Sequence, residues 1–131
     1  MVVSAVAPKT AANELLSPPW QDLLGTFIDY LRAECGLAEN TVDAYRRDLL
    51  RFFDWLDQYH PKRSLDDLGI RDLSSYVASL HDSSLAPTTI ARHIVSIRML
   101  YRYLQLEGAI KDSQADLLDR PRTWQRIPSV L

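Results

Sequence analysis

Residues 36–56 read GLAENTVDAYRRDLLRFFDWL, and this stretch decides the fold class. Its main apolar residues recur every three or four positions, which is the period of one face of an α-helix. They are Val42, Tyr45, Leu49, Phe53 and Leu56. Pro61 ends the pattern, because proline cannot continue a helix. The stretch therefore predicts a helix over residues 39–59 that buries this face.

The polar side of the same predicted helix carries arginines. At about 100° per residue, Asn40, Arg47 and Arg51 fall within an arc of about 60° opposite the apolar face, while Arg46 lies nearer its edge. Aspartates at positions 43, 48 and 54 are helical neighbours that can pair with these arginines. Two interpretations stay open: a solvated helix surface, or a set of contacts to phosphate groups.

Three further helices follow from the same period. The first of them begins at residue 18, and the other two run over residues 70–81 and 87–106. A short turn at residues 114–118 is expected after the last helix. Pro18 and Pro87 suit first turns, and Gly36 and Gly108 suit the left-handed residue that ends a helix. No segment alternates apolar and polar residues as a half-buried strand does. The predicted fold class is all-α, a compact bundle of four main helices plus a short fifth.

Length and composition favour one soluble domain. The chain has 131 residues, of which 47% are hydrophobic, enough for a real core. We expect a flexible leader at residues 1–17, a helical domain at 18–119 and a proline-punctuated segment at 120–131. A single cysteine, Cys35, excludes an internal disulfide and is expected to be partly buried. With no secretion signal and no long apolar run, the prediction is a cytoplasmic protein without a membrane partner.

Charge is distributed unevenly along the chain. The formal net charge is −2, but residues 1–85 carry 8 basic against 13 acidic residues, whereas residues 86–131 carry 7 against 4. The helix predicted over residues 87–106 has three arginines and no acid, and polar side chains gather at its start. These are Thr88, Thr89, Arg92, His93 and Ser96. This helix start is the best candidate for an element that faces an anion.

Signatures of catalysis are missing from the sequence. Its four glycines form no phosphate-binding loop, and His60, His81 and His93 are scattered without the spacing of metal ligands. Acidic pairs such as Asp66-Asp67 are best interpreted as helix-start residues. We therefore predict no catalytic residue, no bound metal and no cofactor in this chain.

Three separated motifs carry a family resemblance. They are NTVDAYRRDLLRFFDWL, then TIARHIVSIRMLYRYL, then PRTWQRIPSVL, in that order. Together they resemble the N-terminal core-binding domain of the Xer-type tyrosine recombinases, over about residues 20–131. Ala38 and Ala86 depart from the family pattern, since a capping Ser or Thr is frequent at those positions.

The resemblance implies an orthogonal, SAM-like helical domain that binds one half-site of a double-stranded DNA recombination site. The implied partners are that DNA, a C-terminal catalytic domain of the same parent chain, and other recombinase subunits on the DNA. The nucleophilic tyrosine would belong to the catalytic domain, so Tyr45, Tyr76 and Tyr101 are expected in the core. On this view the fragment is not itself an enzyme.

The candidate DNA contacts combine the arginine arc with the two polar helix starts. Short polar side chains and free N–H groups at a helix start suit phosphate, and most protein–DNA hydrogen bonds go to the backbone. The candidates are Asn40, Thr41, Arg46, Arg47, Arg51, Thr88, Thr89, Arg92, His93 and Ser96. The alternative is a helical protein–protein adaptor with solvated arginines, in which Val95 and Met99 dock a partner helix.

Overall fold

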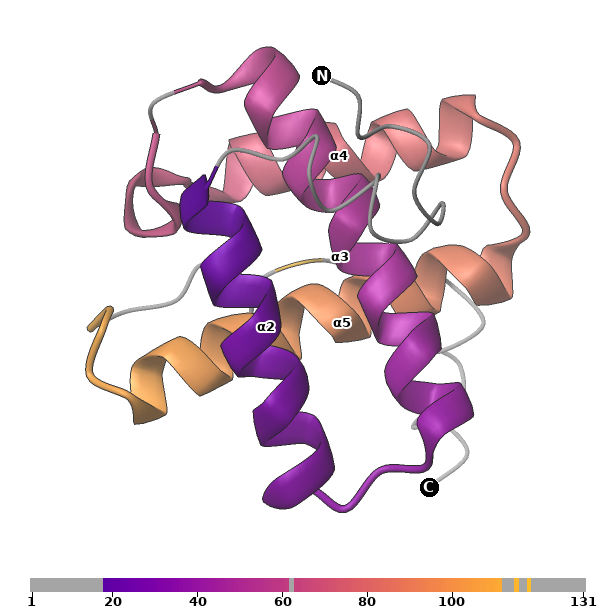
Figure 1. Cartoon of the computed structure of the whole chain (residues 1–131). Coiled ribbons are helices and arrows are strands. Elements are labelled where there is room, and N and C mark those ends of the chain that lie inside the picture. Colours follow the sequence, from indigo (N-terminus) through magenta and orange to yellow (C-terminus); the bar gives the residue numbers. More distant parts are fainter. Residues whose placement is uncertain (1–17, 62, 112–114, 116–117, 119–131) are drawn as a thin grey trace, which may run out of the picture. The chain divides into compact units, whose positions relative to one another are not determined.

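The computed structural model describes residues 18–61, 63–111, 115 and 118. The described residues form α2 (Pro18–Ala33), α3 (Glu39–Tyr59), the short 3-10 helix η2 (Leu65–Asp67), α4 (Ile70–Asp82) and α5 (Pro87–Leu106) (Figure 1). No strand occurs in this part of the chain, so the all-α prediction is confirmed. The predicted leader, the segment from residue 120 onward and most of the predicted turn at 114–118 lie outside the described residues.

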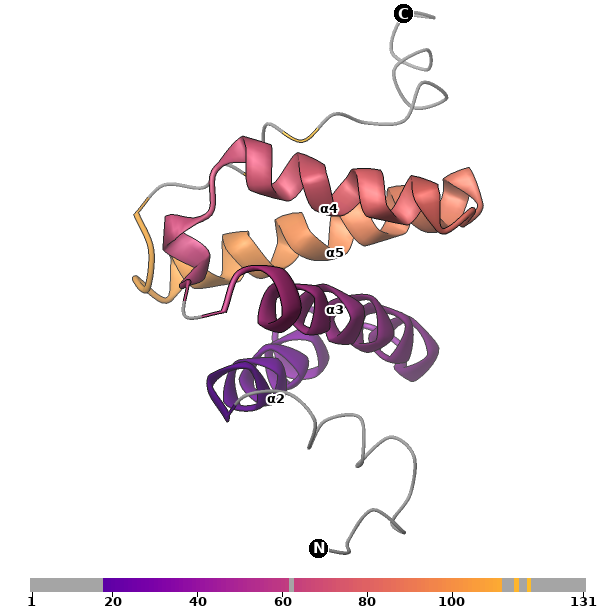
Figure 2. The ribbon, with the colours of Figure 1, turned by 90° about the horizontal axis from the view of Figure 1, so that it is seen from above.

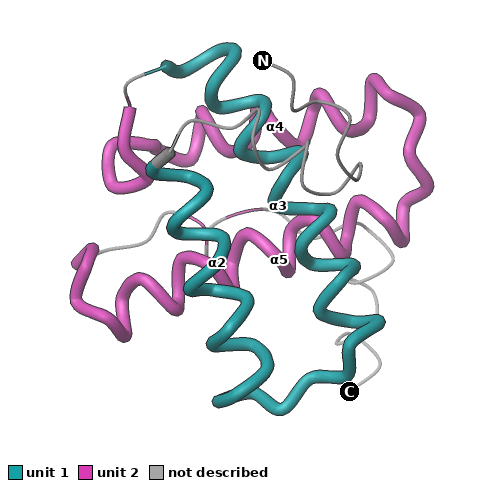
Figure 3. Tube along the Cα trace, in the orientation of Figure 1, with its two compact units in different colours: residues 1–62 teal, residues 63–131 magenta. Residues whose placement is uncertain are grey.

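The chain divides into two compact units, Met1–Lys62 and Arg63–Leu131 (Figure 3). In the first unit, α2 and α3 run antiparallel and pack side by side. In the second, α4 and α5 do the same, as Figure 2 shows. Each unit is thus built on a helical hairpin, and each is described by itself below.

The first unit buries an apolar face of α2 and most of the face predicted for α3, where two further residues are also buried. Leu24, Phe27, Ile28 and Leu31 of α2 are buried, as are Val42, Leu49, Phe53 and Leu56 of α3. Tyr45, predicted on the same face, is only half-buried. Phe52 and Asp48, which the single stripe did not include, are 0% and 2% exposed. The buried face of α3 is therefore wider than one stripe of residues.

Trp20 fastens the start of α2 to the end of α3. Its ring stacks on Phe53 with the centroids 5.0 Å apart and the planes within 2° of parallel. Its indole Nε1–H donates to Asp57 Oδ1 over 2.9 Å. The apolar body and the polar edge of the indole are thus both satisfied, as a partly buried tryptophan requires.

The turn between these helices depends on Gly36, as predicted. The helix α2 ends at Ala33, and Gly36 adopts a left-handed φ of 61°, which costs little without a Cβ. The N–H groups of Cys35 and Leu37 donate back to the carbonyls of Tyr30 and Leu31. Cys35 itself is exposed, so the expectation of a partly buried thiol is wrong, because the residue lies in this surface turn.

In the second unit, the loop before α4 contains η2, and Asp66-Asp67 lie in its first turn, as predicted for helix-start residues. Tyr101 of α5 donates its hydroxyl hydrogen to the Leu65 carbonyl at 2.9 Å. Arg63 Nη2 donates to Asp72 Oδ2 at 3.1 Å, and the same carboxylate oxygen accepts the N–H of Gly69 at 3.0 Å. These bonds fix the 3-10 helix η2 and cap the start of α4.

The helix α5 is buried nearly all round. The apolar residues that recur at helical spacing are all buried, namely Ile90, Ile94, Ile97, Tyr101 and Leu104. Leu100 and Tyr103 are buried as well, while Val95 and Met99 are half-buried. The helix ends where predicted, with Gly108 at a left-handed φ of 77°. A helix with so broad an apolar surface offers few positions to solvent, and these lie mainly at its two ends.

Candidate nucleic-acid interface

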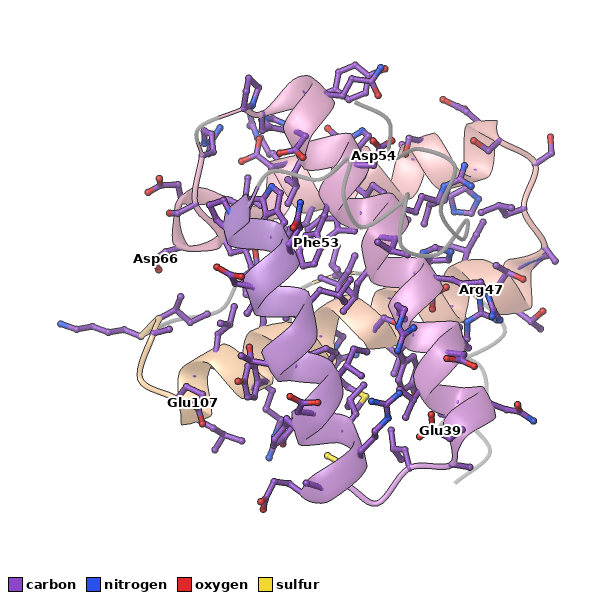
Figure 4. The ribbon with its side chains drawn as sticks, viewed as in Figure 1. Glu39, Arg47, Phe53, Asp54, Asp66 and Glu107 are labelled. Carbon is purple, nitrogen blue, oxygen red and sulfur yellow. The ribbon has the colours of Figure 1, made fainter. Side chains whose placement is uncertain are left out.

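The arginine arc of α3 is exposed as the sequence predicts. Asn40, Arg47 and Arg51 are exposed, while Thr41 and Arg46 are half-buried. Figure 4 shows Arg47 on the side of α3 opposite Phe53, whose ring faces α2. The core contacts of the first hairpin lie on another side of α3, and the two exposed guanidinium groups of the arc lie one helical turn apart.

A bidentate ion pair that the sequence pattern did not predict lies beside the start of α3. Arg32 Nε lies 2.9 Å from Glu39 Oε2, and Arg32 Nη2 lies 3.0 Å from Glu39 Oε1. Both side chains are largely exposed, at 42% and 65%. The hydrogen bonds to Glu39 and the charge of its carboxylate raise the pKa of Arg32. The only acid in the first turn of α3 is therefore engaged by a guanidinium group.

The start of α5 has no acid in its first turn and no side-chain cap. Its N-cap is Ala86, whose methyl group cannot accept a hydrogen bond from the first N–H groups. Thr88 is exposed at this end, and Thr89 and Arg92 are half-buried. The start of α3 is likewise preceded by an uncapping alanine, Ala38. Both helix starts therefore leave backbone donors to water or to a ligand.

Two of the predicted DNA contacts are buried. Ser96 is 0% exposed and donates its hydroxyl to the Arg92 carbonyl at 3.0 Å. His93 is 4% exposed, and its Nδ1 lies 3.4 Å from the Tyr76 hydroxyl. The helical period places both residues on a polar edge of α5, but it does not show that neighbouring residues cover this edge. Neither side chain presents a surface to DNA in this structure, so both leave the set of proposed contacts.

Of the three tyrosines predicted in the core, two are buried. Tyr76 and Tyr101 are each 1% exposed, as predicted, whereas Tyr45 is half-buried. Burial raises the pKa of Tyr101 above its ordinary value, and the nearby charges of Asp66 and Asp72 add to the effect. A buried phenol that resists ionisation is suited to packing rather than to attack on a substrate.

Groups that would indicate other functions do not assemble in the described residues. No set of three His, Cys, Asp or Glu side chains there is arranged to hold a metal ion. Among the residues that the structure describes, no helix combines the length and the apolar character that a membrane-spanning segment requires.

The helices and the resemblance together define a class, the SAM-like all-helical domains of recombinases. The chain belongs to the family of phage integrase N-terminal SAM-like domains, which matches residues 24–108. This span runs from the first turns of α2 to the glycine after α5. The predicted resemblance and fold class are thus confirmed.

Curated relatives carry the name tyrosine recombinase XerD. The protein of Vibrio cholerae serotype O1 is 37% identical over 119 residues, which are 91% of this chain and 38% of the relative. That of Bradyrhizobium diazoefficiens is 38% identical over 109 residues, covering 83% and 34% of the two chains. That of Lacticaseibacillus casei is 34% identical, covering 83% and 36%. The chain thus spans little more than a third of each relative's length. No solved structure matches it.

Proposed function

We propose that this chain is the DNA-binding part of a site-specific tyrosine recombinase and grips one half-site of a double-stranded recombination site during strand exchange. The observation that carries the proposal is the exposed pair Arg47 and Arg51 on α3, in a chain of the integrase N-terminal family. Two guanidinium groups one turn apart match the close spacing of phosphates along a duplex.

The arginines of α3 favour a contact centred on residues 46–51. Residues 46–51 hold three arginines, whereas the following stretch to Tyr59 holds Asp54 and Asp57 and no basic residue. In Figure 4, Glu39 and Asp54 lie toward opposite ends of α3, with Arg47 between them. DNA repels the acidic stretch after Arg51, so in this proposal the duplex lies against residues 46–51 and the turns around Asn40. The start of α5, with Thr88, Thr89 and Arg92, supplies further phosphate contacts in this proposal.

Catalysis is assigned to the parent protein outside this chain, since the chain covers little more than a third of its relatives. In this proposal the partners are the recombination site, the catalytic domain of the same parent chain and the other recombinase subunits on the DNA. The present chain supplies positioning, because phosphate contacts fix register on the duplex without carrying out chemistry.

Replacing Arg47 with glutamine tests the arginine arc. We expect roughly 5- to 10-fold weaker binding of a half-site duplex at about 0.1 M salt, and a salt dependence shallower by about one ion, because one phosphate contact is lost. The control is Arg71→Gln, which removes the same charge from an exposed position on α4. Fluorescence anisotropy at several salt concentrations measures both. Equal losses from the two variants would show that only net charge matters.

Two substitutions at Ala86 test the start of α5. Serine and aspartate both cap a helix, so Ala86→Ser and Ala86→Asp should each raise the free energy of unfolding by about 1 kcal/mol. Only aspartate places a carboxylate where the phosphate would bind, so Ala86→Asp alone should weaken half-site binding, by several-fold. Urea unfolding and anisotropy give the two readouts. Undiminished affinity in Ala86→Asp would remove the start of α5 from the interface.

A further inference from the structure

The ion pair between Arg32 and Glu39 lies across the turn that joins α2 to α3. Arg32 is in the last turn of α2, where a cation also favours the negative end of the helix dipole. Glu39 is the first residue of α3, one residue before Asn40 of the proposed DNA surface. The two parallel contacts of 2.9 and 3.0 Å form a fork that fixes both oxygens of the carboxylate.

A carboxylate at this position has opposite effects on folding and on DNA binding. For the isolated helix, an acid in the first turn is favourable, because it meets the positive end of the dipole. For a bound phosphate it is unfavourable, because two anions then compete for the same N–H groups and repel each other. Among the described residues, the guanidinium group of Arg32 contacts this carboxylate and can neutralise its charge.

We infer that Arg32 is a positioning residue for DNA, which neutralises Glu39 and holds its carboxylate aside so that the first half of α3 accepts a phosphate. The inference deepens the proposed function and rests on it. Arg32 acts through Glu39, because removing the Arg32 side chain leaves the negative Glu39 carboxylate without its partner. This differs from the role of Arg47, whose charge the proposal directs at the phosphate itself.

The two partners of the pair therefore have opposite effects on affinity. Arg32→Gln leaves the Glu39 carboxylate unneutralised, and half-site binding should weaken by about 3-fold at 0.1 M salt. Glu39→Gln leaves the positive charge of Arg32 uncompensated, and binding should strengthen by about 2-fold under the same conditions. The double variant should bind about as wild type does, because the pair then carries no net charge in either protein. All differences should shrink at about 0.5 M salt.

A role of the pair in holding the turn makes a different prediction. Both single variants break the same two hydrogen bonds, so a merely structural pair would weaken binding in both cases and by similar amounts. Thermal unfolding measured alongside should change little, because exposed ion pairs contribute little to stability. Arg32→Lys offers a rescue test. It keeps the charge, so most of the affinity should remain although the fork is lost.

The control for charge is Glu107→Gln, an exposed acid at the far end of α5, about 30 Å along that helix from its start. It should leave half-site binding within about 1.5-fold of wild type. Equal gains from Glu39→Gln and Glu107→Gln, or a loss from Glu39→Gln, would overturn the inference. The proposed function fails separately, if Arg47→Gln leaves binding unchanged. If Arg47→Gln weakens binding and Arg32→Gln does not, only the role of Arg32 is lost.

Discussion

Replacing Phe53 with alanine should lower the free energy of unfolding by about 3–5 kcal/mol, as is typical for a phenylalanine removed from a packed core. Phe53 is 0% exposed, and its ring stacks on Trp20 at 5.0 Å. Truncation leaves a cavity beside an indole whose N–H is already fixed to Asp57, so Trp20 cannot move in to fill the space without losing that bond. Urea unfolding followed by circular dichroism measures the loss.

Tyr59→Ala is the matched control for Phe53→Ala. Tyr59 lies on the same helix, less than two turns further on, and is 61% exposed. Removing a ring that is already largely in water should cost no more than about 1 kcal/mol. The comparison separates packing from any general effect of replacing an aromatic residue with alanine in α3. Comparable losses in the two variants would show that the stacked pair does not hold the first hairpin together.

Helix boundaries were predictable because they depend on local signals. The structure has α3 over Glu39–Tyr59 and α5 over Pro87–Leu106, the same residues that the sequence predicts. Pro87 fixes a backbone angle suited to a first turn, and Gly108 adopts a conformation that other residues resist. Such signals act within a few residues, so no knowledge of the tertiary structure is required.

Burial was less predictable, because it depends on neighbours distant in the sequence. A single apolar stripe on a helix predicts burial against one neighbouring element. In α3, Phe52 and Asp48 are buried although they lie outside the predicted stripe. The bond from Tyr101 to Leu65 joins residues 36 positions apart, and no local pattern predicts that these two residues meet. Local pattern contains none of this information.

The candidate interface divides in the same way. Exposure of Arg47 and Arg51 follows from the helical period and was predicted. The burial of Ser96 depends on which residues cover α5, and it was not predicted. The pair of Arg32 with Glu39 was missed although its residues are only seven positions apart. The left-handed turn at Gly36 was predicted, and a search for opposite charges across that turn would have found the pair.

Replacing Tyr101 with phenylalanine should destabilise the protein at neutral pH and remove part of its sensitivity to alkali. At pH 7 the expected loss is about 1–2 kcal/mol, because the Leu65 carbonyl, an acceptor from a buried hydroxyl, loses its donor while the ring stays in place. The loss should appear in urea unfolding. An unchanged midpoint would show that the bond to Leu65 does not stabilise the loop before α4.

The alkaline part of the prediction follows from the pKa of Tyr101, which burial and the charges of Asp66 and Asp72 raise in the folded protein. In the unfolded chain the phenol titrates near its ordinary pKa of about 10. Above that pH the unfolded state releases a proton that the folded state retains. The contribution of Tyr101 to the free energy of unfolding is therefore complete below pH 10 and declines as the pH rises further. Phenylalanine has no proton to release, and the difference between Tyr101→Phe and wild type should therefore narrow above pH 10. The control is Tyr45→Phe, in which Tyr101 is intact, so its free energy of unfolding should still decline above pH 10. If the difference in unfolding free energy between Tyr101→Phe and wild type stays constant up to pH 11.5, the decline does not come from Tyr101.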